Sequence, residues 1–157
     1  MNIFIGADHR GYAMKEGLIS WMQQQGFTAQ DVGATDFTEG DDYPDYATIV
    51  AKKVMEDGEN NRGILLCGSG VGMAVTANKI PGIRAANIES VDVAKSARND
   101  DDINIVSLGS DILSLEDAQA IVATFLHTPF SHIYQNYYYY HFDDPTIGDR
   151  YLLVFCE

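Results

Sequence analysis

The sequence predicts an α/β fold: a single domain in which helices cover both faces of a five-stranded parallel sheet, giving a three-layer αβα sandwich. Two observations support this prediction. Five short apolar runs alternate with five segments whose apolar residues recur at helical spacing. The chain has 157 residues, which suits one domain, and its hydrophobic fraction of 46% is enough to fill one core.

The first half of the chain contains two strand–helix pairs. Its first apolar run is rich in β-branched and aromatic residues, which is typical of a strand. Gly26 ends the first helical pattern, and Pro44 stands in the first turn of the second, where its missing N–H is tolerated. The predicted elements are strand 2–7, helix 11–26, strand 27–33 and helix 43–58.

The second half continues the alternation. Ser114 is placed to cap the last helix. The predicted elements are strand 62–68, helix 71–79, strand 83–88, helix 91–99, strand 103–109 and helix 114–127. We therefore expect one domain over residues 1–130, followed by an aromatic C-terminal tail over residues 131–157.

Charge and apolar content argue against several classes of function. With 10 basic and 23 acidic residues the net charge is −13, which argues against binding to nucleic acid or to an anionic membrane. The acidic segment 36–45 is interpreted as a solvated loop. No stretch approaches the roughly 18 apolar residues of a membrane helix, and no export signal is visible. Cys67 and Cys156 are too few for a disulfide framework, so we expect a cytoplasmic protein.

Chemically useful side chains gather in the loops of the predicted sheet. Ligands of open parallel sheets bind at the carboxyl ends of the strands. Asp8 and His9 follow the first strand, and residues 67–72 follow the third. We expect Asp100–Asp102, just before the fifth strand, to join them.

The turn CGSGVG has two interpretations. Its three glycines, with Glu89 about 20 residues further on, imitate a dinucleotide-binding fingerprint, but the spacing is GxGxG rather than GxGxxG. Alternatively, the glycines expose backbone N–H groups to a small anion at the start of the next helix. The same field would stabilise a thiolate at Cys67, which suits that residue to act as a base or nucleophile. The competing interpretation is that Cys67 is a small buried hydrophobe.

Four motifs give the chain a family resemblance. They are GADHRGYAMK near the N-terminus, DYPDYA at 42–47, GILLCGSGVGMAVTANKIPGIRAA at 63–86 and NIVSLG at 104–109. In this order, over residues 1–130, they resemble the ribose-5-phosphate isomerase B and galactose-6-phosphate isomerase family. The resemblance implies a Rossmann-like domain, a homodimer or homotetramer with active sites shared between chains, and no metal or cofactor. It also implies interconversion of an aldose phosphate and a ketose phosphate through a cis-enediolate.

The resemblance assigns roles to the residues around the turn. Cys67 matches the base that moves a proton between neighbouring carbons, and Ser69 lies beside it. Asp8 would bind sugar hydroxyls, Tyr43 would wall the pocket, and His9 would help to hold the phosphate across a dimer interface. The enediolate oxygen would be held by the backbone N–H groups of Gly68, Gly70, Val71 and Gly72.

The chain departs from the family pattern at the residue that opens the sugar ring. Where the family reads ARxHNDANV, this chain reads ARNDDDINI, with Asp100 at the histidine position and Asp101 at the asparagine position. A carboxyl group is a poorer acid at neutral pH than an imidazole, unless neighbouring carboxylates favour its protonated form. With that help we predict that Asp100 is catalytic and that Asp101 binds substrate. The alternative is an exposed acidic turn without a catalytic role.

The phosphate-binding arginines of the family are also absent. Asp111 stands where the family has an arginine after LG, and Tyr134 and Tyr138 stand at two arginine positions of its closing helix. The tyrosines of the tail, residues 137–140, are predicted to pack at a subunit interface. The cationic side chains that could replace the arginines are His9, Arg10, Lys79, His132 and His141.

These features together predict an aldose–ketose isomerase of the ribose 5-phosphate and ribulose 5-phosphate type. Its partner would be a small sugar or sugar phosphate. Two alternatives remain open: an isomerase of a different or unphosphorylated sugar, and a non-catalytic partner subunit of a heteromeric sugar-phosphate isomerase. Cys67 and Ser69 argue against the non-catalytic subunit, whereas the absent arginines and histidine favour it.

Overall fold

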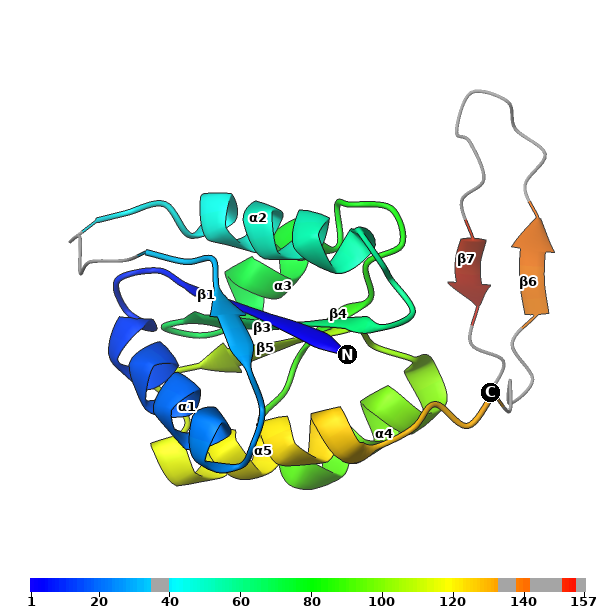
Figure 1. Cartoon of the computed structure of the whole chain (residues 1–157). Coiled ribbons are helices and arrows are strands. Elements are labelled where there is room, and N and C mark those ends of the chain that lie inside the picture. The colour runs from blue at the N-terminus through cyan, green and yellow to red at the C-terminus, as the bar shows by residue number, and fades with distance from the viewer. Residues whose placement is uncertain (35–39, 133–137, 142–150, 155–157) are drawn as a thin grey trace.

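The computed structural model describes residues 1–34, 40–132, 138–141 and 151–154. Strands and helices alternate from the N-terminus to the end of α5 (Figure 1). They are β1 (Asn2–Ala7), α1 (Tyr12–Gln24), β2 (Ala29–Asp31), α2 (Tyr43–Met55), β3 (Asn61–Cys67), α3 (Val71–Ala77), β4 (Ala85–Asn87), α4 (Val91–Asp101), β5 (Ile105–Gly109) and α5 (Leu115–His127). The predicted sequence of elements is confirmed, with ends that differ by a few residues, as helix and strand ends commonly do.

The five strands form one parallel sheet in the order β2-β1-β3-β5-β4. Ala7 at the end of β1 pairs with Leu66, and Cys67 at the end of β3 pairs with Gly109. The chain passes from β1 to β2 on one side and then crosses to β3 on the other. Ligands bind at such a switch in strand order, beyond the carboxyl ends of the strands. We call this end of the sheet the carboxyl edge and the opposite end the amino edge.

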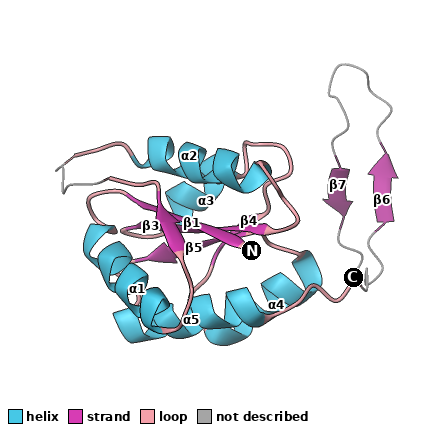
Figure 2. Ribbon diagram, viewed as in Figure 1, coloured by secondary structure: helices cyan, strands magenta, loops and turns pink. Residues whose placement is uncertain are grey.

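Helices cover both faces of the sheet, as Figures 1 and 2 show. α2 packs with α3 on one face, and α5 packs with α1 and α4 on the other. Side chains alternate along β3, so Leu65 and Cys67 join the core under α2 and α3, whereas Ile64 and Leu66 join the opposite core. This alternation determines the face of the sheet on which the Cys67 side chain lies.

Serine side chains cap two of the helices. The Oγ of Ser114 accepts a hydrogen bond from the N–H of Asp117 at 3.1 Å, which confirms the predicted start of α5. The Oγ of Ser90 accepts one from the N–H of Val93 at 3.3 Å, a cap that the sequence analysis does not name. Both caps satisfy backbone donors that the first turn of a helix leaves without a partner.

Beyond α5 the structure describes a second sheet of two strands. β6 (Tyr138–His141) pairs antiparallel with β7 (Tyr151–Val154), with Tyr140 opposite Leu152. These two strands are not predicted from the sequence. Tyr134 and Tyr137 lie outside the described residues, so the predicted interface role of the aromatic tail stays a prediction. None of the helices in the described ranges is long and apolar enough to cross a membrane.

Candidate active site

Cys67 is the last residue of β3 and lies at the carboxyl edge of the sheet, next to the end of β1. It is a free cysteine and only 6% exposed. Its Sγ accepts a hydrogen bond from the backbone N–H of Gly70 at 3.1 Å. A backbone donor directed at the sulfur stabilises negative charge there, which is what a thiolate base requires.

Gly70 holds the geometry of this turn. Its φ of 78° is in the left-handed region, which favours glycine. A Cβ on Gly70 would overlap Oδ1 of Asn87 and come within 2.9 Å of the carbonyl carbon of Leu108. The Oγ of Ser107 donates a hydrogen bond of 2.5 Å to the carbonyl oxygen of Gly70. The N–H that faces Cys67 is therefore held in place from two sides.

The rest of the turn is lined by Ser69 and Tyr43. The Oγ of Ser69 accepts a hydrogen bond of 3.4 Å from the N–H of Val71, and Ser69 is exposed. The ring of Tyr43, the first residue of α2, lies so close to Gly72 that a Cβ there would be 2.9 Å from two ring carbons. The structure thus places Tyr43 beside the turn, where it can wall a pocket.

Asp8 follows β1 and is 5% exposed. Its Oδ1 accepts hydrogen bonds from the N–H groups of Arg10 and Gly11, both at 3.0 Å. Its own N–H donates to the carbonyl oxygen of Leu66 at 3.3 Å. Asp8 therefore shapes the loop after β1 as well as bringing a carboxylate next to the end of β3.

His9 is held by Asp41. The backbone N–H of His9 donates to Oδ1 of Asp41 at 2.8 Å, and Nδ1 of the ring lies 2.7 Å from the same oxygen. Because a carboxylate only accepts, Nδ1 carries the proton and the ring orientation is defined. Burial raises the pKa of Asp41, but hydrogen bonds from His9 and Tyr46 lower it by more, so the pKa lies below its usual value.

An ion pair lies directly over Gly68. The guanidinium of Arg10, in the loop after β1, bonds to the carboxylate of Asp111, which follows β5. A Cβ on Gly68 would come within 2.5 Å of Nε of Arg10 and 2.8 Å of Oδ2 of Asp111. The pair therefore covers the residue that follows Cys67.

Asp100 and Asp101 lie elsewhere. Both belong to the last turn of α4, which leads into the start of β5, so they lie at the amino edge of the sheet. Oδ1 of Asp100 accepts a hydrogen bond from the side chain of Asn99 at 2.6 Å, and the carbonyl oxygen of Asp101 accepts one from Arg84 at 2.5 Å. The expectation that residues 100–102 gather with Cys67 is wrong within one chain, because residues that precede a parallel strand lie at its amino end.

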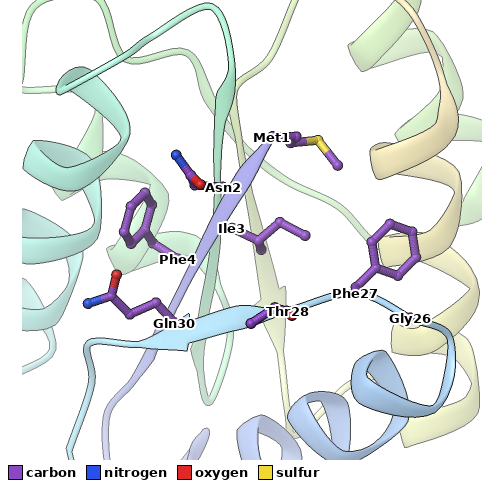
Figure 3. Close-up of a pocket in the computed structure, with 8 residues that line it drawn as sticks. All are labelled: Met1, Asn2, Ile3, Phe4, Gly26, Phe27, Thr28 and Gln30. Carbon is purple, nitrogen blue, oxygen red and sulfur yellow. The ribbon is translucent and has the colours of Figure 1, made fainter.

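An open pocket of about 580 Å³ lies at the amino edge (Figure 3). Its lining comes from the starts of β1 and β2 and the segment between α1 and β2, and Figure 3 shows Phe4 and Phe27 on opposite sides of the strands. It is remote from Cys67, and none of the side chains that line it is an acid or a base. Within the described ranges, no three His, Cys, Asp or Glu side chains gather into a group that could hold a metal ion.

Comparison with known proteins identifies the family. The sequence matches the ribose/galactose isomerase family over residues 3–137. The chain belongs to the ribose/galactose isomerase family. A probable ribose-5-phosphate isomerase B from Mycoplasma genitalium is 38% identical over 82% of this chain and 85% of its own. A D-erythrulose-4-phosphate isomerase from Pectobacterium atrosepticum is 36% identical over 83% of this chain and 85% of its own.

Solved structures of this family share the fold. Ribose-5-phosphate isomerase B from Mycoplasma genitalium with bound ribulose-5-phosphate has a TM-score of 0.80 and 38% identity, covering 83% of this chain and 86% of that one. The enzyme from Clostridium thermocellum has a TM-score of 0.79 and 40% identity, covering 83% and 87%. The predicted Rossmann-like α/β fold and the predicted activity class are therefore confirmed, and the chain is an aldose–ketose isomerase of the ribose/galactose isomerase family.

Two contacts of this candidate site are not predicted from the sequence. The first is the support that Asp41 gives to His9, because Asp41 belongs to the acidic segment interpreted as a solvated loop. The second is the ion pair between Arg10 and Asp111. The opposite charges of Arg10 and Asp111, each next to a predicted site residue or motif, are the signal that could have suggested the second contact.

Proposed function

We propose that this protein interconverts an aldose phosphate and a ketose phosphate, of the ribose 5-phosphate and ribulose 5-phosphate type, through a cis-enediolate with Cys67 as the base. The observation that carries the proposal is the Sγ of Cys67 at the carboxyl edge, facing the backbone N–H of Gly70. Further support comes from the similar Mycoplasma genitalium enzyme with bound ribulose-5-phosphate.

The reaction needs one proton to move between neighbouring carbons. The Cys67 thiolate removes the proton from C2 of the open-chain aldose, and the electron pair of that C–H bond forms the C1–C2 double bond of the enediolate. Negative charge develops on O1. A proton passes from the C2 hydroxyl to O1, and the Cys67 thiol returns its proton to C1, which leaves the carbonyl at C2. Atoms and electrons balance without a co-reactant.

The turn after β3 supplies the electrostatic support for this charge. Backbone N–H groups of Gly68, Gly70, Val71 and Gly72 are the proposed donors to the negative charge that the reaction needs, with Ser69 beside the base. Because the N–H of Gly70 already donates to Cys67, we propose that it stabilises the thiolate. The other three N–H groups are proposed to donate to the enediolate oxygen. Removing one such donor typically lowers kcat by about 10²–10³-fold.

The other predicted residues take supporting roles in the proposal. Asp8 binds sugar hydroxyls, Tyr43 walls the pocket and His9, oriented by Asp41, contacts the substrate. Asp100 and Asp101 lie at the amino edge, so their proposed roles in ring opening and substrate binding require a second copy of the chain. We therefore propose a homodimer or homotetramer, working in the cytoplasm without metal or cofactor.

A second candidate substrate deserves testing because the relatives differ in their sugar. The name of the Pectobacterium relative specifies a four-carbon sugar phosphate, whereas the Mycoplasma name specifies a five-carbon one. Both names specify a phosphate. The same isomerisation on a tetrose phosphate is therefore the alternative that the comparisons favour over an unphosphorylated sugar.

The test is isomerisation of ribose 5-phosphate, erythrulose 4-phosphate and the free sugars in deuterated water, followed by NMR. A proton moved by Cys67 exchanges with solvent, so the product should carry deuterium at the carbon that receives it. Deuterium at that carbon would exclude a hydride shift, and normal turnover in a Cys67→Ala variant would refute Cys67 as the base. Absence of turnover on every sugar would favour the non-catalytic partner subunit instead.

A further inference from the structure

The carboxyl edge holds one arginine whose surroundings suit an anion. The guanidinium of Arg10 lies directly over Gly68, next to the base Cys67, and is paired with Asp111. The two side chains are 57% and 48% exposed, so both are open to a ligand that enters from solvent. A guanidinium presents a planar set of donors that matches the oxygens of a phosphate.

The backbone around the pair is tied together across three strands. The Oγ of Ser110 lies 2.9 Å from the carbonyl oxygen of Arg10 and 3.1 Å from that of Cys67, and the N–H of Ser110 donates to the carbonyl oxygen of Cys67 at 2.9 Å. The N–H of Asp111 donates to the carbonyl oxygen of Gly68 at 3.0 Å. The loops after β1, β3 and β5 therefore form one frame, and the distance between Arg10 and the base is set by that frame.

The other described arginines and lysines do not compete for this role. Lys15, near the carboxyl edge, is fully buried and bonded to Asp31 and to the carbonyl oxygen of Ala34. Lys95 is exposed midway along α4. The other arginines and lysines of the described ranges lie at the amino edge, because each stands near the end of a helix or the start of a strand. They are Lys52, Lys53, Arg62, Lys79, Arg84 and Arg98.

We propose that Arg10 binds the phosphate group of the substrate and that Asp111 holds Arg10 over Gly68 until the substrate arrives. This inference rests on the proposed function, because it assigns a residue to the phosphate of the same substrate. Of the cations that the sequence left open as substitutes, His9 and Arg10 follow β1 and lie at the carboxyl edge, and Arg10 presents the guanidinium that suits a phosphate. Lys79 lies at the amino edge, and so does His132, which follows the end of α5.

With Asp111 present, the site should bind phosphate more weakly than Arg10 alone would. Its carboxylate accepts from the same guanidinium that the phosphate needs, so the two anions compete. Exposed ion pairs contribute little stability, so the substrate displaces Asp111 readily. The negative charge of Asp111 nevertheless stays beside the phosphate and repels it. Asp111 is therefore a positioning residue, and removing its charge should tighten binding.

The test measures binding of ribose 5-phosphate by calorimetry in the full-length Cys67→Ala protein, which prevents turnover during the titration. In that background Arg10→Ala should raise Kd on the order of 10-fold to 100-fold. Asp111→Asn should lower Kd by roughly threefold, and Arg10→Lys should be intermediate, because lysine keeps the charge but loses the planar donors. Lys53→Ala and Glu56→Gln, which remove either charge of an exposed pair remote from Cys67, are the matched controls and should leave Kd unchanged.

The opposite directions of Arg10→Ala and Asp111→Asn are the decisive readout, since a merely structural pair would respond alike to the loss of either member. Unchanged Kd in Arg10→Ala, changes in the same direction, or no binding of ribose 5-phosphate by the parent would overturn the inference. Failure of the proposed function is distinguishable, because it appears as full turnover in the single Cys67→Ala variant or as absent turnover in the unmodified protein.

Discussion

The backbone N–H of Gly70 donates a hydrogen bond to the Sγ of Cys67 over 3.1 Å, three residues along the same turn. This contact depends on the left-handed backbone of Gly70 and connects a local conformational requirement to the reactivity of the sulfur. A donor placed before the reaction begins needs no rearrangement when charge develops.

Cys67→Ala should abolish isomerisation while the fold stays intact. The substitution removes the base but only one sulfur atom from the core, so its cost in unfolding free energy should be about 1 kcal/mol or less. Cys67→Ser, which keeps a side chain of similar size, should lose on the order of 10²–10⁴-fold in kcat because a hydroxyl is a much weaker base. The measurements are steady-state kinetics and urea unfolding. Normal turnover in the alanine variant would place the base elsewhere.

Gly70→Ala tests the turn, and the chain offers a matched control in Gly26. Both glycines have positive φ, 78° and 82°, but nothing lies within 4 Å of a Cβ on Gly26. Gly26→Ala should therefore lower the free energy of unfolding by only about 1–2 kcal/mol, which is the strain of a left-handed backbone at alanine. Gly70→Ala should cost a further 1–3 kcal/mol or so, because its Cβ meets Asn87 and Leu108.

The two alanine variants should also differ in activity. Gly70→Ala displaces the N–H that faces Cys67, so its kcat should fall, whereas Gly26→Ala should keep the kcat of the unmodified protein. Urea unfolding and kinetics on both variants check this pair of outcomes. Equal losses of stability would contradict the crowding around Gly70.

Asp41→Asn should make the free energy of unfolding less dependent on pH in the acid range. The folded pKa of Asp41 is lowered, because hydrogen bonds from His9 and Tyr46 outweigh the effect of burial. A lowered carboxyl pKa contributes stability that is complete above the unfolded value of about 3.9 and is lost as pH falls through the folded value. The unmodified protein should therefore lose more unfolding free energy than Asp41→Asn as pH falls below about 4. Parallel acid profiles from urea unfolding would refute this assignment.

Most of the fold could be predicted because each element carries its own local signal. Gly26 and Ser114 mark helix boundaries, and the apolar runs separate strands from helices. The strand order could not be predicted, because it depends on which distant strands pair. The error over Asp100 has a related origin: nearness to a strand in the sequence does not by itself give the edge of the sheet, and Asp100 precedes β5 and so lies at its amino end.

The candidate site also has one part that could be predicted from the sequence and another that could not. The turn from Cys67 to Gly72 is contiguous, so its cysteine and glycines could be singled out from the sequence. Their spacing left more than one interpretation open, and the family resemblance favoured Cys67 as the base. The contact between His9 and Asp41 joins residues 32 positions apart, and that between Arg10 and Asp111 joins residues 101 positions apart. Such pairings arise only after the strands are ordered. No local pattern in this chain encodes them.

Lys15→Met should destabilise the protein. The Lys15 side chain is fully buried, donates to the carbonyl oxygen of Ala34 at 2.8 Å and pairs with Asp31. Removing one partner of a buried ion pair lowers the free energy of unfolding by about 3–5 kcal/mol. Because Asp31 is partly exposed, the loss here should be nearer 2–3 kcal/mol. Lys95→Met, at an exposed lysine of α4, is the control and should change unfolding free energy by about 0.5 kcal/mol or less. Similar losses in both variants would show that the buried contacts contribute little.

The last prediction concerns the assembly. Cys67 lies at the carboxyl edge and Asp100 at the amino edge, so a site that uses both residues must take them from two chains. The unmodified protein should therefore sediment as a dimer or tetramer at micromolar concentration. Asp100→Ala alone should lose activity, as should Cys67→Ala alone.

Mixing these two inactive variants tests whether the site is shared. In a heterodimer of Cys67→Ala and Asp100→Ala chains, one site carries both substitutions and the other carries neither. Because random association makes about half of the dimers mixed, unfolding and refolding the variants together should restore about a quarter of the unmodified activity. Each variant refolded by itself is the control and should stay inactive. Restored activity cannot arise if Asp100 acts within its own chain, since every chain of the mixture then carries a defective site. A monomeric protein, or full activity in Asp100→Ala, would remove Asp100 from the catalytic site and leave ring opening to another residue of the carboxyl edge.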